Sequence, residues 1–137
     1  MMKKKKNNKG FSLVELIVVI AIMAVLVGVL APQFIGYVAK SKVSTDLQNA
    51  DSLKSAVEIA IAEADSASTA TVTVSGSGKT ITVAGTGLTF AVSSVSLKAT
   101  WSDGAYTYSA STGWATTTDS QTTDVTPNHK LSEVFTN

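Results

Sequence analysis

The fold of this chain is decided by residues 9–38, which read KGFSLVELIVVIAIMAVLVGVLAPQFIGYV. No residue between Leu16 and Leu30 carries a charge, and apolar residues continue at Phe34 and Ile35. A helix rises about 1.5 Å per residue, so about 20 apolar residues cross a bilayer core of roughly 30 Å. The stretch therefore predicts a helix that is long enough to span a membrane.

The residues before this stretch are basic, whereas the rest of the chain is mildly acidic. Five lysines fall within the first ten positions, and the positive-inside tendency keeps such a segment in the cytoplasm. The C-terminal part would then lie outside the cell membrane. Beyond Gly10, six scattered lysines stand against ten carboxylates, a formal charge of −4. Because binding a phosphate backbone requires a clustered basic face, we expect no direct nucleic-acid binding.

Three simpler structures compete with a specialised membrane segment. A secretory signal peptide combines a basic region, an apolar region and a cleavage site after small residues. The best such site follows Ala31, where Pro32 is unfavourable for cleavage. An uncleaved membrane anchor remains open, whereas a buried core helix is normally shorter and less uniformly apolar.

Glu15 places a carboxylate at the beginning of the apolar run. On insertion scales a charged group within a spanning helix costs on the order of 2.5–3.5 kcal/mol, and such groups are usually retained for a partner. Near a helix end, the side chain can instead reach the interface. If the chain is cleaved between Gly10 and Phe11, a new α-amino group lies four residues before Glu15. The amine and the carboxylate would then neutralise each other, within one chain or between neighbouring chains.

Residues 9–16, KGFSLVEL, with the basic residues before them and the apolar run after them, resemble the N-terminal signature of type IV pilins and pseudopilins. The resemblance covers about residues 3–42. It implies that a prepilin peptidase cleaves after Gly10 and methylates the amine of Phe11. It also implies that Glu15 pairs with the N-terminal amine of an adjacent subunit during assembly.

Pro32 lies where these proteins commonly carry a helix-disrupting proline, shortly after Gly28. Proline removes one backbone donor and crowds the preceding turn, so local kinking or melting between Gly28 and Pro32 is expected on physical grounds as well. The alternative is an ordinary kink in a membrane helix.

Beyond Gln33 the pattern remains helical to about Ala67 but becomes amphipathic. Apolar residues recur at three- and four-residue steps, at Leu47, Ala50, Leu53, Val57, Ile61 and Ala64. Charged residues are expected on the other faces, namely Asp46, Asp51, Lys54, Glu58, Glu63 and Asp65. The apolar stripe must pack on something, and a following globular part is favoured over a coiled-coil stem because the a/d pattern does not continue over enough heptads.

After Ser66 the sequence indicates strands separated by turns. Thr71–Val74 and Thr80–Val83 alternate β-branched residues around a Ser/Gly segment, which predicts a hairpin. Further strands are expected at Leu88–Val92, Val95–Trp101, Ala105–Ser109 and Trp114–Thr117, with turns at Asp103-Gly104 and Thr112-Gly113.

We expect these strands to form an antiparallel sheet that covers the helical stripe. Its inner face would carry Ile81, Val83, Phe90, Leu97, Trp101 and some of Tyr106, Tyr108 and Trp114. Residues 118–128 are expected to form an exposed loop. Leu131, Val134 and Phe135 are expected to hold the C-terminal segment against the sheet rather than leave it as a loose tail.

The predicted fold class is α+β and pilin-like, with a long N-terminal helix packed on a small antiparallel sheet. We divide the chain into a leader at residues 1–10, a membrane or filament-core helix at 11–32, an amphipathic continuation at 33–67 and a β-rich head at 68–137.

Residues that carry catalytic or metal chemistry are sparse. His129 is the only histidine, and no hydrolase elbow, phosphate-binding loop or zinc spacing accompanies it. Asp119 and Asp124 lack the alternating oxygen ligands of a calcium loop. We therefore expect no enzyme activity, no cofactor and no metal. Exposed aromatics would provide a carbohydrate platform, but aromatics in a small sheet are more often core residues.

The chain has no cysteine, so disulfides and thiolate metal sites are excluded. Many Gram-negative pilins close a C-terminal loop with a disulfide, and the departure from that pattern favours a Gram-positive type IV pilin.

The resemblance implies a homo-oligomeric filament subunit, most simply a major pilin, whose fibre serves adhesion, twitching motility or biofilm formation. The implied partners are the prepilin peptidase, an inner-membrane assembly platform and its ATPase, and the membrane before assembly; the filament lies on the cell surface. A pseudopilin of a type II secretion or DNA-uptake machine is the alternative. A membrane-tethered binding module or enzyme with a pilin-like anchor is a third hypothesis.

Overall fold

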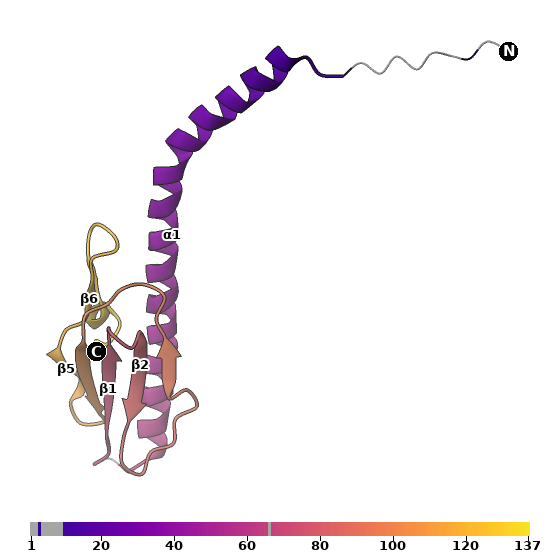
Figure 1. The fold of residues 1–137 in the computed structure, drawn as a ribbon. Coiled ribbons are helices and arrows are strands. Elements are labelled where there is room, and N and C mark those ends of the chain that lie inside the picture. The colour runs from indigo at the N-terminus through magenta and orange to yellow at the C-terminus, as the bar shows by residue number, and fades with distance from the viewer. Residues whose placement is uncertain (1–2, 4–9, 66) are drawn as a thin grey trace. The chain divides into compact units, whose positions relative to one another are not determined.

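The computed structural model of this chain describes residues 3, 10–65 and 67–137. These residues fall into two compact units, of which the first ends at Ile35 and the second is Gly36–Asn137. Helix α1, Leu13–Glu63, contributes to both units, and the β-strands belong to the second (Figure 1). Most of the expected leader, residues 1–2 and 4–9, lies outside the part that the structure describes.

The first unit consists mainly of the N-terminal part of α1. This part is long and apolar enough to cross a membrane. Every side chain from Phe11 to Ile35 is exposed, because no other described segment of the unit packs on the helix. The expected apolar helix is therefore confirmed, and its surface has no packing partner among the described residues of the unit.

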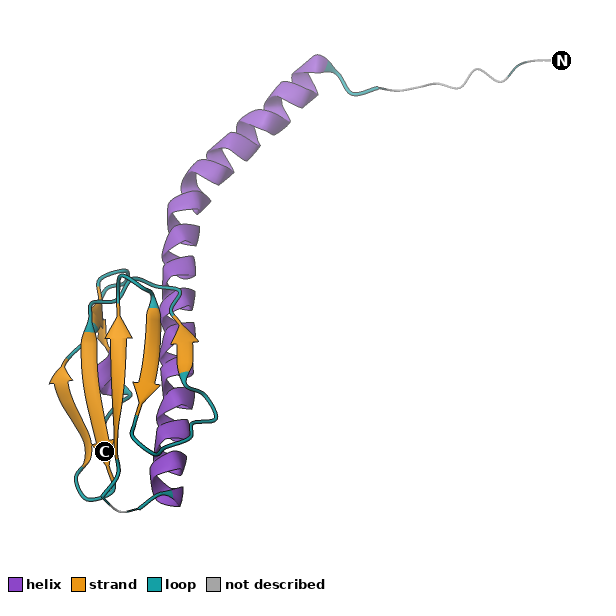
Figure 2. Ribbon diagram, turned by 60° about the horizontal axis from the view of Figure 1, so that its bottom comes forward, coloured by secondary structure: helices purple, strands orange, loops and turns teal. Residues whose placement is uncertain are grey.

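The second unit is an antiparallel five-stranded sheet that packs on the C-terminal part of α1 (Figure 2). The strand order is β3-β2-β1-β4-β5. The bounds are β1 Thr69–Ser75, β2 Thr80–Ala84, β3 Ser94–Ser96, β4 Gly104–Ser109 and β5 Gly113–Thr118. The predicted hairpin is confirmed as β1 and β2, and the last two predicted strands are confirmed as β4 and β5.

Two predicted strands are wrong in whole or in part. Residues 88–92 form no strand, and their two large apolar side chains, Leu88 and Phe90, pack against the edge of the core from a loop. The predicted strand at 95–101 is shortened to β3, after which the chain leaves the sheet to reach α1.

The predicted turns have different outcomes. Residues 110–112 form the turn between β4 and β5, and Gly113 follows with a φ of 72°, a conformation that glycine adopts without strain. Gly104 instead begins β4, so the turn expected at Asp103-Gly104 is wrong.

Residues 118–128 are only partly the exposed loop that the polar sequence predicts. Gln121–Thr122, β6, pairs with His129–Lys130, β7, in a second small sheet. Ser120 and Thr122 are fully buried, and Val125 is buried with them. The Ser120 hydroxyl donates to the Ser102 carbonyl, and the Thr122 hydroxyl accepts from the Asp124 N–H, which explains why these polar side chains are tolerated in the interior.

The core between α1 and the sheet contains the predicted helical stripe. Ala50, Leu53, Val57 and Ile61 are buried against residues of the strands and of the segment after β3, which include Ile81, Val83, Leu97, Trp101, Tyr106 and Trp114. The stripe also includes Asp46, whose side chain is 0% exposed. The expectation that Asp46 faces away from the stripe is therefore wrong.

Asp46 is buried because three donors from the segment after β3 satisfy its carboxylate. The Lys98 N–H donates to Oδ1 at 2.8 Å and the Ala99 N–H donates to Oδ2 at 2.8 Å. The indole N–H of Trp101 donates to Oδ2 at 2.9 Å. Backbone donors that a strand would pair within the sheet are used here by a helix side chain, which explains the early end of β3.

The C-terminal segment is held against the sheet, as predicted. The Phe135 ring lies 4.8 Å from the ring centre of Tyr106 and 4.9 Å from that of Trp114. The Lys54 ammonium donates to the Thr136 carbonyl at 2.8 Å, and the indole N–H of Trp114 donates to Glu58 at 2.8 Å. Helix residues therefore bind both the C-terminal segment and β5.

A second polar cluster connects β4 to the short helix η1, Leu131–Glu133. Burial raises the pKa of Tyr106, so its hydroxyl stays protonated and donates to Asp119 Oδ1 at 2.8 Å. Ser132 donates to Asp119 Oδ2 at 2.8 Å. Burial alone would raise the pKa of Asp119, but the hydrogen bonds from Ser132 and Tyr106 outweigh it and lower that pKa.

Acid is therefore expected to destabilise the second unit partly through Asp119. A carboxyl group whose folded-state pKa is lowered contributes stability above its unfolded pKa, about 4, and that stability is lost as the pH falls through the folded value. We expect Asp119→Asn to lower the melting temperature at pH 7 and to flatten its decline below about pH 4. Tryptophan fluorescence melts across this pH range test the prediction, and parallel curves for the two proteins would contradict it.

Candidate assembly site

The N-terminus of α1 is closed by two reciprocal hydrogen bonds between Ser12 and Glu15. The Ser12 N–H donates to Glu15 Oε2 at 2.8 Å, and the Glu15 N–H donates to Ser12 Oγ at 3.2 Å. This arrangement is a capping box, and it satisfies two backbone donors that a helix start otherwise leaves unpaired. The Ser-x-x-Glu spacing indicates this role of Glu15, which was not among the predicted ones.

The capping role leaves Glu15 available for a second partner. Its Oε1 makes no hydrogen bond to any part of the chain that the structure describes, and the side chain is exposed. Phe11, Glu15, Leu16 and Val19 line a shallow, mostly apolar hollow. If neighbouring helices or lipid exclude water from this hollow, a cation within it would attract the carboxylate more strongly than it does in water.

The bond between Gly10 and Phe11 lies just outside the helix. Both residues are exposed and non-helical, and a side chain at Gly10 would meet nothing within 4 Å. An exposed peptide bond outside regular secondary structure is what a peptidase active site needs. The geometry is thus compatible with cleavage at the predicted position, and the processing roles of Gly10 and Phe11 stay predictions.

Gly28 and Pro32 lie within a helix that is continuous from Leu13 to Glu63. A side chain at Gly28 would likewise meet nothing within 4 Å. Pro32 provides no backbone donor, so one hydrogen bond of the helix is missing without a break in the assigned helix. Disruption between these two residues stays a prediction for the assembled state.

The other candidate residues have local roles. His129 Nδ1 lies 3.2 Å from Glu133 Oε2 on the surface. A hydrogen bond from the Lys130 N–H, followed by that of His129, lowers the pKa of Glu133. Asp124 accepts a hydrogen bond from the Thr100 N–H. Trp101, Tyr106 and Trp114 are buried, so they form no exposed carbohydrate platform.

Comparisons with known proteins match the N-terminal part of the chain. The family model described as the prokaryotic N-terminal methylation motif matches residues 5–31. A fimbrial protein of Pseudomonas aeruginosa is 40% identical over 58 residues, which are 42% of this chain and 38% of that protein. The type IV major fimbrial protein FimA of Dichelobacter nodosus is 35% identical over 57 residues, which are 42% of this chain and 36% of FimA.

A further relative is the prepilin peptidase-dependent protein A of Clostridium perfringens (strain 13 / Type A). It is 43% identical over 60 residues, which are 43% of each chain. The chain thus spans about two fifths of the length of the curated relatives it matches. No solved structure matches the chain. The matches nevertheless confirm the resemblance that residues 9–16 indicate: the N-terminal segment of this chain carries the methylation motif and is similar to that of type IV fimbrial proteins.

Proposed function

We propose that this chain is the major structural subunit of a Gram-positive type IV pilus and that it catalyses no reaction itself. The observation that carries the proposal is the contrast between the two units. The second unit buries its own core, whereas in the first unit every side chain from Phe11 to Ile35 is exposed, on an apolar helix with one carboxylate at its start. An apolar surface of this extent requires lipid or other helices around it.

Assembly follows from this requirement. Before assembly the helix lies in the cell membrane with the basic leader on the cytoplasmic side. After cleavage between Gly10 and Phe11, an assembly platform and its ATPase would move the helix out of lipid into a bundle of copies. The Phe11 amine of one copy then pairs with Glu15 of its neighbour, so neither charge remains alone among apolar side chains. Adhesion, motility or biofilm formation would be properties of the finished fibre.

The lack of cysteine supports a Gram-positive pilin, because the C-terminal segment is held by other means. Phe135 packs between two aromatic rings, and Lys54 binds the Thr136 carbonyl. These contacts perform the task that a disulfide loop performs in many Gram-negative pilins.

Mass spectrometry of fibres sheared from cells tests the proposal. We expect long fibres in which this chain is the most abundant protein and begins at an N-methylated Phe11. The variant Gly10→Val should retain the leader and remain in the membrane, since its bulkier side chain obstructs the peptidase. Gly36→Val, a glycine in the helix after the apolar run, is a matched control that should be processed normally.

Other outcomes would support other functions. A mature chain that begins at Phe11 in cells without long fibres would indicate a pseudopilin. A chain that keeps its leader, or is cleaved after Ala31, would indicate an ordinary anchor or a secretory signal and would refute the proposal.

A further inference from the structure

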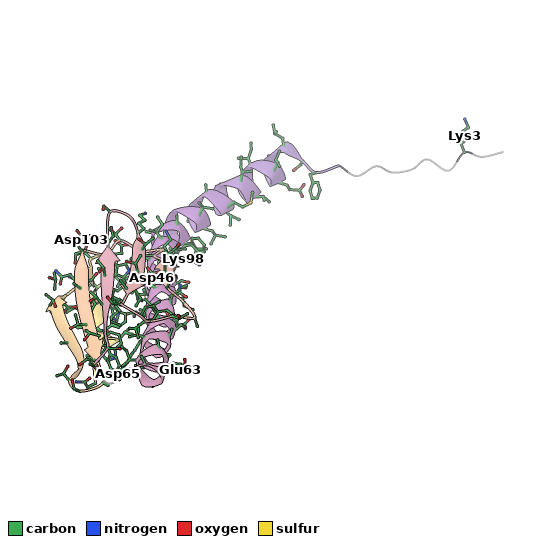
Figure 3. All side chains as sticks on the ribbon, turned by 90° about the horizontal axis from the view of Figure 1, so that it is seen from below. Lys3, Asp46, Glu63, Asp65, Lys98 and Asp103 are labelled. Carbon is green, nitrogen blue, oxygen red and sulfur yellow. The ribbon has the colours of Figure 1, made fainter. Side chains whose placement is uncertain are left out.

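In the second unit, exposed lysines without an ion-pair partner among the described residues lie at one end of α1, and an exposed glutamate without one lies at the other end. Lys40 and Lys42 lie in the first turns of the helix within this unit, and Glu63 is its last residue. Lys98 lies beside the same end as the two helix lysines, because its N–H binds Asp46. Figure 3 shows Lys98 and Asp46 at one end of the head and Glu63 at the other.

We call the end with Lys40, Lys42 and Lys98 the basic end, and the carboxylates near it accept hydrogen bonds within the same unit. Each accepts at least one hydrogen bond from a backbone or side-chain donor: Asp46, Asp103, Asp119, Asp124 and Glu133. The side chains of Lys40, Lys42 and Lys98 are exposed and bind no carboxylate of the described residues. This end therefore presents ammonium groups without a direct counterion.

The opposite end presents carboxylates. Glu63 is exposed and has no hydrogen bond or ion pair with the described part of the chain, and Asp65 follows two residues later. The start of β1 and the ends of β2 and β4 lie at this end, as their pairing shows. The connections at 85–93 and 110–112 that follow β2 and β4 contain no charged residue, so nothing in them neutralises Glu63.

We propose that Lys40, Lys42 and Lys98, at the basic end of the second unit of one copy, bind Glu63, at the opposite end of the second unit of another copy of this chain. The inference rests on the proposed filament, in which all copies point the same way. The 21 residues from Lys42 to Glu63 rise about 32 Å, so a copy displaced by that distance along the helix axis brings the two ends level. Such a contact joins different surfaces of the two copies, and it continues as an open fibre rather than closing into a dimer.

Charge reversal tests the contact. Lys42→Glu and Glu63→Lys each turn attraction into repulsion, and we expect each to lower the yield of sheared fibres at low salt roughly fivefold. The double variant Lys42→Glu/Glu63→Lys restores opposite charges and should recover most of the yield. Both residues are exposed, so the fold should be spared, and unchanged tryptophan fluorescence melts would verify this. A double variant no better than either single variant would count against the proposal.

Cross-linking gives a readout that does not depend on yield. The chain has no cysteine, so Lys42→Cys/Glu63→Cys supplies the only two thiols. A bismaleimide as long as an extended Lys–Glu ion pair should convert its fibres into a ladder of covalent multimers. The control Asp51→Cys/Glu63→Cys, with both thiols exposed on α1, should give monomers. If the wild-type protein and Lys42→Cys/Glu63→Cys both form fibres but the variant gives no ladder, this contact is overturned and the proposed function is not. If the wild-type protein forms no fibres, the proposed function itself is refuted.

Discussion

Replacement of Glu15 by alanine is expected to lower the yield of surface fibres on the order of a hundredfold, while membrane insertion and leader removal continue. The variant leaves the Phe11 amine without its counterion in an apolar bundle, and breaking a buried ion pair costs about 3–5 kcal/mol. About 3 kcal/mol per subunit corresponds to roughly a hundredfold in an association constant. Fibre yield by shearing, with the processed chain quantified in the membrane fraction, provides the measurement.

The capping box makes a sharper version of this experiment possible. Glu15→Gln keeps an acceptor for the Ser12 N–H but removes the charge, and Ser12→Ala keeps the charge but removes the acceptor for the Glu15 N–H. If the charge is what assembly requires, Glu15→Gln should be as defective as Glu15→Ala, while Ser12→Ala should assemble. A defect in Ser12→Ala as large as that in Glu15→Ala would assign Glu15 a helix-capping role and contradict the pairing with the amine.

Replacement of Asp46 by alanine is expected to destabilise the head by about 3–5 kcal/mol, since each buried donor left without a partner costs about 1–3 kcal/mol. Three donors lose their acceptor at once, namely the Lys98 and Ala99 N–H groups and the Trp101 indole. The segment that follows β3 then loses its hydrogen bonds to α1 and keeps only its apolar contacts with the helix. Both tryptophans of the chain lie in the head, so fluorescence during urea unfolding in detergent reports on this unit alone.

Two further variants separate the role of Asp46 from a general effect of helix charge. Asp46→Asn keeps one acceptor oxygen but turns an amide N–H₂ toward the remaining donor, so we expect a loss of about 1–3 kcal/mol. Asp51→Ala removes an exposed carboxylate from the same helix and should change stability by less than about 0.5 kcal/mol. Equal effects of Asp46→Ala and Asp51→Ala would contradict the role of the buried hydrogen bonds.

The N-terminal helix and the helical stripe were predictable from local pattern. A single apolar run in a membrane must be helical, because only a helix satisfies its own backbone hydrogen bonds there. Residues at three- and four-residue steps share a helix face, whichever residues they contact in the folded protein. The hairpin of β1 and β2 and the pair of β4 and β5 follow for a similar reason, since alternation and turn residues act over a few positions.

Asp46 and the segment after β3 were not predictable in this way. The sequence places an aspartate among charged helix residues, and nothing near it in sequence supplies its three donors. They come from residues more than 50 positions away. Because the same donors bind Asp46, β3 ends early. This one long-range interaction therefore explains why Asp46 was wrongly expected to face away from the core and why the strand at 95–101 was predicted too long.

The apolar helix with Glu15 at its start and the β-rich head that follows it in the chain could be inferred from local periodicity and hydropathy alone. Which polar groups are buried, and which charges have no partner among the described residues, depends on contacts that form only when the chain folds. The desolvation of a carboxylate is offset only by donors that the folded chain brings to it. Asp46 therefore became part of the core, while Lys42 and Glu63 remained available for another copy.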